Sequence, residues 1–272
     1  MKNILHDRCG IEIPAEKKYL FKTRLSDLLA QENIPTFREL HSRLQAADGR
    51  LTELLIEFMT TNETSFFRDG HPFKTLISKI IPKMAEKTKK INFHTSPGLR
   101  IWSAGCSSGQ EPYSVAMTLM EWLENETTCS IDRISILATD ISEKILEKAE
   151  KGIYTENELQ KGLPHNMKEK YFRKNDTCWL VDDKLRNIIK FQILNLAKPF
   201  SCKLDNFDII LCRNVIIYFS AEFKRKIIDQ ISDLLNPGGV LILGASENLY
   251  NISSDFEARH AGRTTIYYRV KK

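Results

Sequence analysis

From residue 99 onward, short apolar runs alternate with amphipathic segments, and this alternation constrains the fold more than any other feature of the chain. The apolar runs have the length of strands, and the amphipathic segments have a helical period. Strands are predicted at 99–103, 134–139, 191–194, 207–212 and 240–244, and helices at 111–124, 142–151 and 221–235. This order predicts an α/β domain with a mostly parallel sheet covered on both faces. Two further strands within 256–270 are expected to close it as a hairpin around 260–263.

Residues 1–60 lack this alternation and predict a small helical domain. Pro35 and the Ala-Asp-Gly at 47–49 divide it into short helices. Apolar residues at helical spacing form two faces, Tyr19, Leu20, Leu25, Leu28 and Leu29 in one and Leu51, Leu54, Leu55 and Phe58 in the other. Basic residues recur at the polar positions, namely Lys17, Lys18, Lys22, Arg24, Arg38 and Arg43. We favour a solvated helix face over a docking surface for these basic residues.

Two segments interrupt the regular pattern. Residues 73–84 predict another helix that ends near Pro82, and the polar, basic stretch 83–98 predicts a loop. Residues 152–190 predict an insertion beside the sheet, with a short helix at 167–172 and two antiparallel strands at 177–181 and 186–191. Insertions of this length in α/β enzymes more often have a function than not.

The composition excludes several classes of protein. The chain has 272 residues, 42% hydrophobic and 28% charged, which is typical of a globular protein with room for two domains. Its net charge of +5 is too small to indicate nucleic-acid binding, and no nucleic-acid motif is present. The six cysteines form no CxxC pair, and no His lies at metal-ligand spacing from them, so we expect no metal and a reducing cytoplasm. Without a secretory signal or an apolar run of bilayer length, direct membrane insertion is not expected.

A turn with two glycines, 103–109 (SAGCSSG), follows the first predicted strand and opens a helix. Gly105 permits a sharp turn and a close approach of the backbone to a ligand, and Pro112 suits the first turn of a helix. A strand, a glycine turn and a helix form the ligand crevice of doubly wound sheets. On glycine spacing alone, a ligand site and a tight turn without a ligand are equally open.

Charged residues follow two more of the predicted strands. Asp140 ends the second strand, where a carboxylate can accept both hydroxyls of a ribose. Asp140 can instead cap the helix that starts at 141 or 142, but the neighbouring glycine turn favours the ribose role. Arg213 directly follows a buried strand at the expected mouth of the crevice, and its alternative role is to anchor a nearby carboxylate.

With these features the chain resembles the CheR family of chemotaxis receptor methyltransferases. The matching stretches occur in order and cover nearly the whole chain. They are 60–69 (TTNETSFFRD), 100–114 (RIWSAGCSSGQEPYS), 138–142 (ATDIS), 148–154 (KAEKGIY), 207–219 (FDIILCRNVIIYF), 234–239 (LLNPGG) and 246–248 (SEN).

The resemblance implies a fold and a division into domains. The fold is a small all-helical N-terminal domain followed by a Rossmann-like domain of the S-adenosylmethionine (AdoMet) methyltransferase type, with a small antiparallel β-subdomain inserted. The helical domain, 1–60, is implied to dock on a receptor. A linker and leading helix cover 61–98. The methyltransferase domain covers 99–272, with the β-subdomain near 165–190.

The resemblance also implies roles for single residues. Together with Gly105 of the glycine turn, the implied AdoMet-binding residues are Asn62, Thr64, Arg68, Glu111, Asp140, Asn195, Leu196, Arg213 and Asn214. The residues implied to lie near the transferred methyl are Arg68, Arg213 and Tyr218. Tyr218 either orients the reactants or is a packed aromatic residue after an apolar strand.

The implied reaction transfers the methyl of AdoMet to glutamate side chains on a receptor's cytoplasmic coiled coil and yields S-adenosylhomocysteine (AdoHcy). A glutamate carboxylate is already ionised at neutral pH, so no general base is expected. One arginine can hold one carboxylate oxygen while the other oxygen attacks the methyl. Whether Arg68 or Arg213 does so is open at this stage.

The insertion departs from part of the family. In members that dock on a receptor's C-terminal pentapeptide tether, the loop of the β-subdomain is glycine-rich, whereas 171–180 has no glycine and looks shorter. We therefore expect a cytoplasmic monomer that methylates chemoreceptors without needing the tether. One alternative is a non-catalytic CheR-like sensor of AdoMet or AdoHcy, and another is a methyltransferase with a small-molecule substrate. The complete set of Arg68, Arg213 and Tyr218 favours the receptor methyltransferase.

Overall fold

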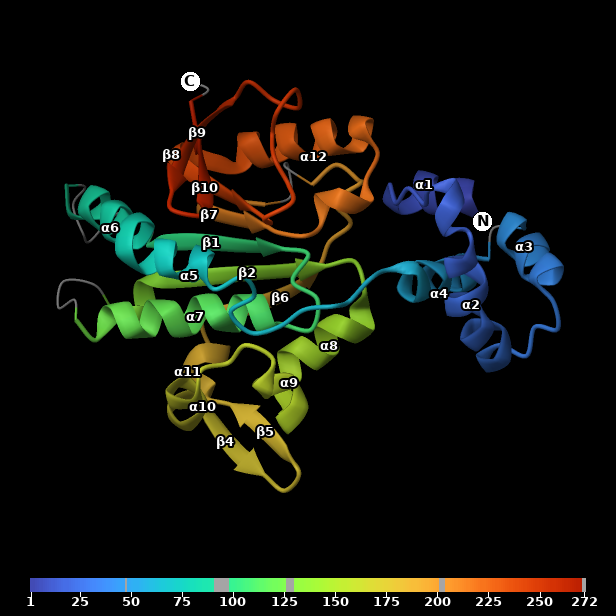
Figure 1. Cartoon of the computed structure of the whole chain (residues 1–272), viewed down its shortest axis with the longest axis horizontal. Helices are drawn as coiled ribbons and strands as arrows, with labels where there is room; N and C mark the ends of the chain where they lie inside the picture. Colours follow the sequence, from blue (N-terminus) through green and yellow to red (C-terminus); the bar gives the residue numbers. More distant parts are fainter. Residues whose placement is uncertain (47, 91–97, 126–129, 201–203, 271–272) are drawn as a thin grey trace.

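The protein consists of a cluster of helices, a large sheet with helices on both faces and a small separate sheet (Figure 1). The fold is described from a computed structural model that covers residues 1–46, 48–90, 98–125, 130–200 and 204–270, without the side chains of 87–90. Residues 91–97 of the predicted loop, together with Cys129 and Cys202, lie outside the described residues. The predicted fold class, a helical N-terminal domain before a Rossmann-like α/β domain with an inserted sheet, is confirmed.

The N-terminal helices are α1 (Lys2–Cys9), the short 3-10 helix η1 (Ala15–Lys17), α2 (Tyr19–Gln31), α3 (Phe37–Gln45) and α4 (Gly49–Met59). Thr36 and Asp48 cap α3 and α4 by accepting the backbone N–H of the third helical residue, as the predicted breaks require. The apolar faces of these helices enclose their own core, which contains Leu25, Leu28 and Leu55. Tyr19 does not belong to this core. It is the first residue of α2 and is 62% exposed, so the prediction that Tyr19 lies on the apolar face was wrong.

Among the described residues the large sheet has seven strands in the order β6-β2-β1-β7-β8-β10-β9. Their bounds are β1 (Leu99–Ala104), β2 (Ile134–Asp140), β6 (Ile189–Ile193), β7 (Phe207–Cys212), β8 (Leu235–Leu243), β9 (Phe256–Ala261) and β10 (Thr264–Arg269). The first five strands of that order are parallel, and the hairpin of β9 and β10 adds antiparallel to β8. The carboxyl ends of β6, β2, β1 and β7 therefore meet along one edge.

Helices cover both faces of this sheet because successive side chains of its buried strands point alternately into two apolar cores. Ile101 points into the core shared with α7 (Gln110–Leu123) and α8 (Glu143–Lys151), whereas Trp102 points into the core shared with α12 (Ala221–Leu234). Figure 1 shows α7 and α12 on opposite sides of the strands. A short 3-10 helix, η3 (Ile131–Arg133), leads into β2, and another, η5 (Ile216–Tyr218), follows β7.

The helix predicted to end near Pro82 instead continues to Lys90 as α5 (His71–Thr75), a π-helical segment η2 (Leu76–Ile80) and α6 (Ile81–Lys90). The N–H of Ile81 reaches back to the carbonyl of Leu76, so this turn holds one residue more than an α-helical turn. The wider turn accommodates Pro82, which has no N–H and whose ring clashes with the carbonyl four residues earlier in a regular α-helix. The predicted loop over 83–98 was therefore wrong for 83–90.

The insertion forms a small antiparallel sheet in the order β3 (Ile153–Thr155), β5 (Cys178–Val181), β4 (Phe172–Asn175). The short helices α9 (Glu156–Gln160), α10 (His165–Tyr171) and α11 (Asp183–Arg186) accompany it. The strand predicted at 177–181 and the helix at 167–172 are present, but 186–191 is not a strand of this sheet. A tight turn at Asp176 pairs β5 with the strand before it, and Ile189 to Ile193 instead joins the large sheet parallel to β2.

No helix within the described ranges is both long enough and apolar enough to cross a bilayer.

Candidate functional site

A cavity of about 1020 Å³, including its opening to solvent, lies at the edge where the parallel strands end. Segments far apart in the sequence line it, and they include every residue that the sequence predicted for the site: Asn62, Thr64, Arg68, Gly105, Glu111, Asp140, Asn195, Leu196, Arg213, Asn214 and Tyr218. The structure thus brings all of these residues together, while their individual roles stay predictions.

The glycine turn is fixed by contacts within the protein. The backbone N–H groups of Gly105 and Cys106 donate to the carbonyl of Thr139 at 2.8 and 2.9 Å, which ties the turn to the end of β2. Gly105 has a φ of +75°, and a Cβ there would lie 2.4 Å from Cγ2 of Val215. The glycine is thus required by the packing of two loops as well as by the left-handed backbone.

Asp140 lies at the end of β2 and lines the cavity with its carboxylate partly engaged. Its Oδ2 accepts the N–H of Ser107 at 2.9 Å and its Oδ1 accepts the N–H of Ser142 at 3.1 Å. Burial raises the pKa of Asp140, and these backbone hydrogen bonds oppose the rise. With backbone hydrogen bonds from Ser142, Ser107 and Ile141, the carboxylate still keeps acceptor capacity for a ligand, because its two oxygens carry four lone pairs. The N-cap of α8 is Ser142, whose hydroxyl accepts the N–H of Ile145, so the alternative of Asp140 as the cap is wrong.

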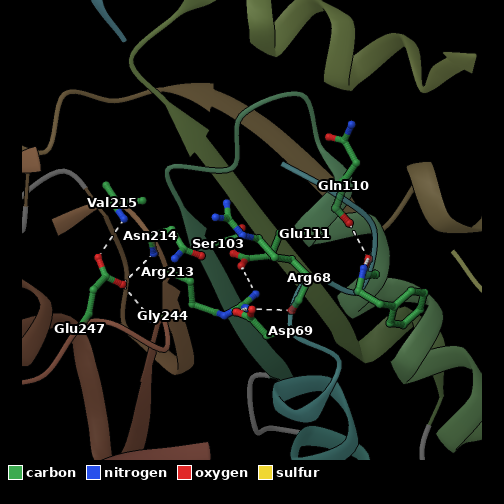
Figure 2. Close-up of polar contacts among 12 residues, drawn as sticks. Arg68, Asp69, Ser103, Gln110, Glu111, Arg213, Asn214, Val215, Gly244 and Glu247 are labelled. Atoms are coloured by element: carbon green, nitrogen blue, oxygen red, sulfur yellow. Dashed lines mark hydrogen bonds and ion pairs between the residues drawn. The ribbon is translucent and has the colours of Figure 1, made fainter. Parts of the chain in front are cut away.

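Arg213 is locked in a buried ion-pair network, which Figure 2 shows beside the linker. Its Nη1 donates to Glu111 at 2.9 Å, and its Nη2 donates to the Asp69 carboxylate at 2.7 Å and to the carbonyl of Arg68 at 2.9 Å. Ser103 adds a hydroxyl bond to the other oxygen of Glu111 at 2.7 Å. Only 1% of the Arg213 side chain is exposed. Anchoring of carboxylates, which the sequence left as the alternative role of Arg213, is therefore what its guanidinium does in this structure.

Arg68, which was also predicted to lie near the transferred methyl, is in a different environment from Arg213. Its side chain is partly exposed at the cavity, and among the described residues it donates only to the carbonyl of Glu63, at 3.0 Å. The backbone on either side of it is left-handed, with φ of +48° at Phe67 and +67° at Asp69. Such strain in residues other than glycine persists only where surrounding contacts impose it, here the bond from Arg213 to the Arg68 carbonyl.

A carboxylate that the sequence gave no role holds the loop after β7. Glu247 accepts the backbone N–H groups of Asn214 at 2.7 Å, Val215 at 3.0 Å and Ile217 at 3.2 Å, and of Gly244 at 2.7 Å. Figure 2 shows it pointing into this loop from the end of β8. The loop carries Arg213, Asn214 and Tyr218, and Glu247 holds it directly at Asn214 and at two positions between Asn214 and Tyr218. Its only sequence signal was its place in the stretch 246–248.

Arg24 is the exception among the predicted basic helix positions. Its guanidinium donates to the carbonyls of Met59 and Thr60 at 2.7 and 3.3 Å and to the hydroxyl of Thr61 at 2.9 Å. It therefore caps α4 and holds the start of the linker that contains Asn62, and the expectation of a solvated Arg24 was wrong. Lys17, Lys18, Lys22 and Arg38 are exposed as expected, and the exposed Arg43 pairs with Glu39.

Two cavity-lining residues come from a part of the chain that the sequence did not connect with the site. Cys9, the last residue of α1, and Ile11 both line the cavity. No local pattern indicated them, because their place depends on how the helical domain sits against the sheet.

Comparisons with known proteins agree with this architecture. Residues 1–60 match the family model described as "CheR methyltransferase, all-alpha domain", and residues 62–265 match "CheR methyltransferase, SAM binding domain". The chain is 39% identical to chemotaxis protein methyltransferase 1 of Pseudomonas aeruginosa, over 97% of this chain and 94% of that protein. It is 38% identical to chemotaxis protein methyltransferase 1 of Vibrio cholerae, over 97% and 93%. It is also 38% identical to the chemotaxis protein methyltransferase of Borreliella burgdorferi, over 90% and 86%.

Proposed function

The chain belongs to the CheR methyltransferase family, and we propose that the cavity at the carboxyl ends of the parallel strands is where its reaction takes place. The protein is an AdoMet-dependent protein-glutamate O-methyltransferase that methylates chemoreceptors and releases AdoHcy. The single observation that supports this placement is the convergence of the linker, the glycine turn and the loops after β2, β6 and β7 on one cavity. No two of these segments adjoin in the sequence.

The side chains of this cavity suit AdoMet chemically. AdoMet carries a ribose diol, an ammonium group, a carboxylate and an adenine ring, and when bound it supplies an electrophilic methyl on its sulfonium. We propose that Asp140 accepts the ribose hydroxyls and that Glu111 faces the ammonium group, because both carboxylates keep lone pairs beyond their protein contacts. Asn62 offers an amide group, Asn195 lines the cavity with its amide bonded to Arg8 and Ala197, and Leu196 adds an apolar side chain.

We propose that Arg68 holds the substrate carboxylate. A receptor glutamate is ionised at neutral pH, so the chain needs a cation to orient it rather than a base to activate it. Arg68 has donors directed to no other described residue and lies at the cavity, whereas Arg213 already serves Glu111 and Asp69. With one oxygen held, the other forms the O–CH₃ bond as the S–CH₃ bond breaks. Tyr218 lines the same cavity, and we assign it the orientation of these two groups.

The finer features of the partner interaction are proposals as well. We propose that the helical domain 1–60 docks on the receptor, that 61–98 is the linker and leading helix, and that the protein works in the cytoplasm as a monomer. We also propose that receptor tails with a pentapeptide tether are not required. The hairpin of β4 and β5 supports this, because a tight turn at Asp176 takes the place of a glycine-rich loop. Titration with a tail peptide checks it, and tight saturable binding would overturn it.

The function is tested by transfer of labelled methyl from AdoMet to a purified receptor cytoplasmic fragment. A methyl ester is released by mild base, so base-labile label on the receptor is the expected result. Arg259→Ala serves as a control, because this exposed residue pairs with Glu257 on β9, away from the cavity. Cofactor binding without transfer to any receptor would support a sensor instead of an enzyme.

A further inference from the structure

We propose that residues 8–12, hereafter the N-terminal strap, form the roof of the AdoMet site and contact the bound cofactor. This rests on the proposed function, because it takes the cavity to be the AdoMet site. It gives the start of the helical domain a role in cofactor binding, separate from any role of that domain in receptor docking.

The strap joins two loops that the sheet keeps apart. At one end the Asn195 side chain, after β6, donates to the carbonyl of Arg8 at 2.8 Å. At the other end the N–H of Glu12 donates to the carbonyl of Tyr218, after β7, at 2.9 Å. Between β6 and β7 lie β2 and β1, so the strap passes over the strand ends that carry Asp140 and Gly105.

The middle of the strap faces the cavity with uncharged side chains. Cys9 and Ile11 both line it, and Ile11 forms an isolated backbone bridge with Phe219, which lines the cavity too. Burial raises the pKa of the Cys9 thiol to about 11, so it is neutral at physiological pH, and its S–H donates to the carbonyl of Leu5 at 3.1 Å. This roof suits the uncharged adenosine part of the cofactor better than its charged methionine part.

Gly10 is the residue that lets the strap come this close. It ends α1 in the left-handed conformation, with a φ of +69°, and its N–H returns to the carbonyl of His6. A Cβ at this position would lie 2.8 Å from the Phe219 ring and 3.1 Å from the Phe223 ring. The ring of His6 already packs edge-on against Phe223, with the centroids 5.2 Å apart. A side chain at Gly10 must therefore lift the strap or displace Phe219, which lines the site.

The test compares Gly10→Ala with Gly262→Ala. Gly262 lies in the hairpin turn between β9 and β10 and has a similar φ of +61°, but a Cβ there would meet no atom of the described residues within 4 Å. The control therefore carries the backbone strain without the clash. Calorimetric titration with AdoHcy is expected to show a Kd raised about tenfold for Gly10→Ala, roughly 1.4 kcal/mol of binding free energy. Gly262→Ala is expected to stay within about twofold of the unsubstituted protein.

Hydrogen exchange gives a readout that a purely structural role would not change. Saturating AdoHcy is expected to slow hydrogen exchange in the peptide that contains Glu12, because contact with the cofactor makes local opening of the N-terminal strap less frequent. If Gly10→Ala does not fold, Ile11→Ala is titrated under the same criterion, with the exposed Ile153→Ala as its control.

The results separate the two claims. An unsubstituted protein that fails to bind AdoHcy would overturn the proposed function and, with it, the roof. If the unsubstituted protein binds AdoHcy and the strap variant binds it no more weakly than its control variant does, the proposed function stands. The proposal that the N-terminal strap contacts the cofactor is then overturned. Exchange at Glu12 that does not change with AdoHcy would overturn it as well.

Discussion

Arg68 and Arg213 illustrate how environment divides the work between two residues of one type. Both were predicted to lie near the transferred methyl, and both line the cavity. Arg213 is enclosed with Glu111 and Asp69 around its guanidinium, whereas Arg68 keeps donors at the cavity. An arginine such as Arg213, whose two Nη groups are engaged by its own protein, stabilises and positions, and one with Nη donors at a cavity can bind a substrate carboxylate.

Alanine at each position is expected to separate these roles. Arg68→Ala should leave the free energy of unfolding nearly unchanged and lower the single-turnover rate of receptor methylation by about 100-fold, the scale of a lost positioning contact. Arg213→Ala should lower the free energy of unfolding by about 3 kcal/mol, because it leaves partly buried carboxylates without their partner. Urea denaturation and single-turnover kinetics measure the two effects. Equal loss of stability in both variants would contradict the division.

Asp140 gives a prediction for pH. Burial raises its pKa, so its carboxylate takes up a proton at a higher pH than an exposed aspartate does. Protonation removes one of the acceptor lone pairs that the carboxylate keeps beside its backbone contacts, so affinity for AdoHcy should be full above this raised pKa and fall as the pH drops through it. Calorimetric Kd values across the acidic range measure the effect. Asp140→Asn should bind more weakly and lose the dependence, and an unchanged pH profile in this variant would contradict the assignment.

At the scale of elements, the site is built from loops held by contacts between distant segments. Periodicity predicted most strands and helices, because each buries a face that its own sequence records. Periodicity assigned 186–191 to the wrong sheet, because an apolar run does not indicate which strand it pairs with. It also ended a helix at Pro82, whereas a π-helical turn allows the helix to continue through this proline. Gly105, Asp140 and Arg213 were indicated by their places at the ends of predicted strands, and the other site residues were found through family motifs. Glu247, Arg24 and the N-terminal strap were missed because their contacts join segments that no local pattern relates.

Glu247→Gln tests the loop after β7. The amide keeps the size of the carboxylate but directs its own N–H groups at backbone donors, so stability should fall by about 2 kcal/mol. The KM for AdoMet should rise because the backbone of Asn214 shifts. Glu222→Gln is the control, since Glu222 is exposed and its described ion pair is with Lys226. A KM equal to that of the control would show that Glu247 does not position the site.

Arg24→Met tests the start of the linker. The substitution keeps the apolar stem and removes the donors to Met59, Thr60 and Thr61, which frees the end of α4. We expect AdoHcy to bind about tenfold more weakly, a change of roughly 1.4 kcal/mol, because Asn62 and Thr64 lose their support. Lys22→Met, on the exposed part of the same helix, should bind normally. Normal binding by both variants would separate the helical domain from the cofactor site.

At the scale of the whole molecule, the cavity belongs to neither domain alone. The sheet supplies Gly105, Asp140 and Arg213, the linker supplies Asn62 to Arg68, and the end of α1 supplies Cys9. The two domains thus share one site, and a chain that loses their contact should lose cofactor affinity before it loses the fold of either domain.

The structure of the complex with AdoHcy tests the central claim most directly. We expect AdoHcy in the cavity with its ribose hydroxyls within hydrogen-bonding distance of Asp140, its sulfur facing Arg68 and Tyr218, and Cys9 and Ile11 in contact with its adenosine. AdoHcy bound elsewhere, or bound in this cavity with Asp140 turned away from the ribose, would contradict the account.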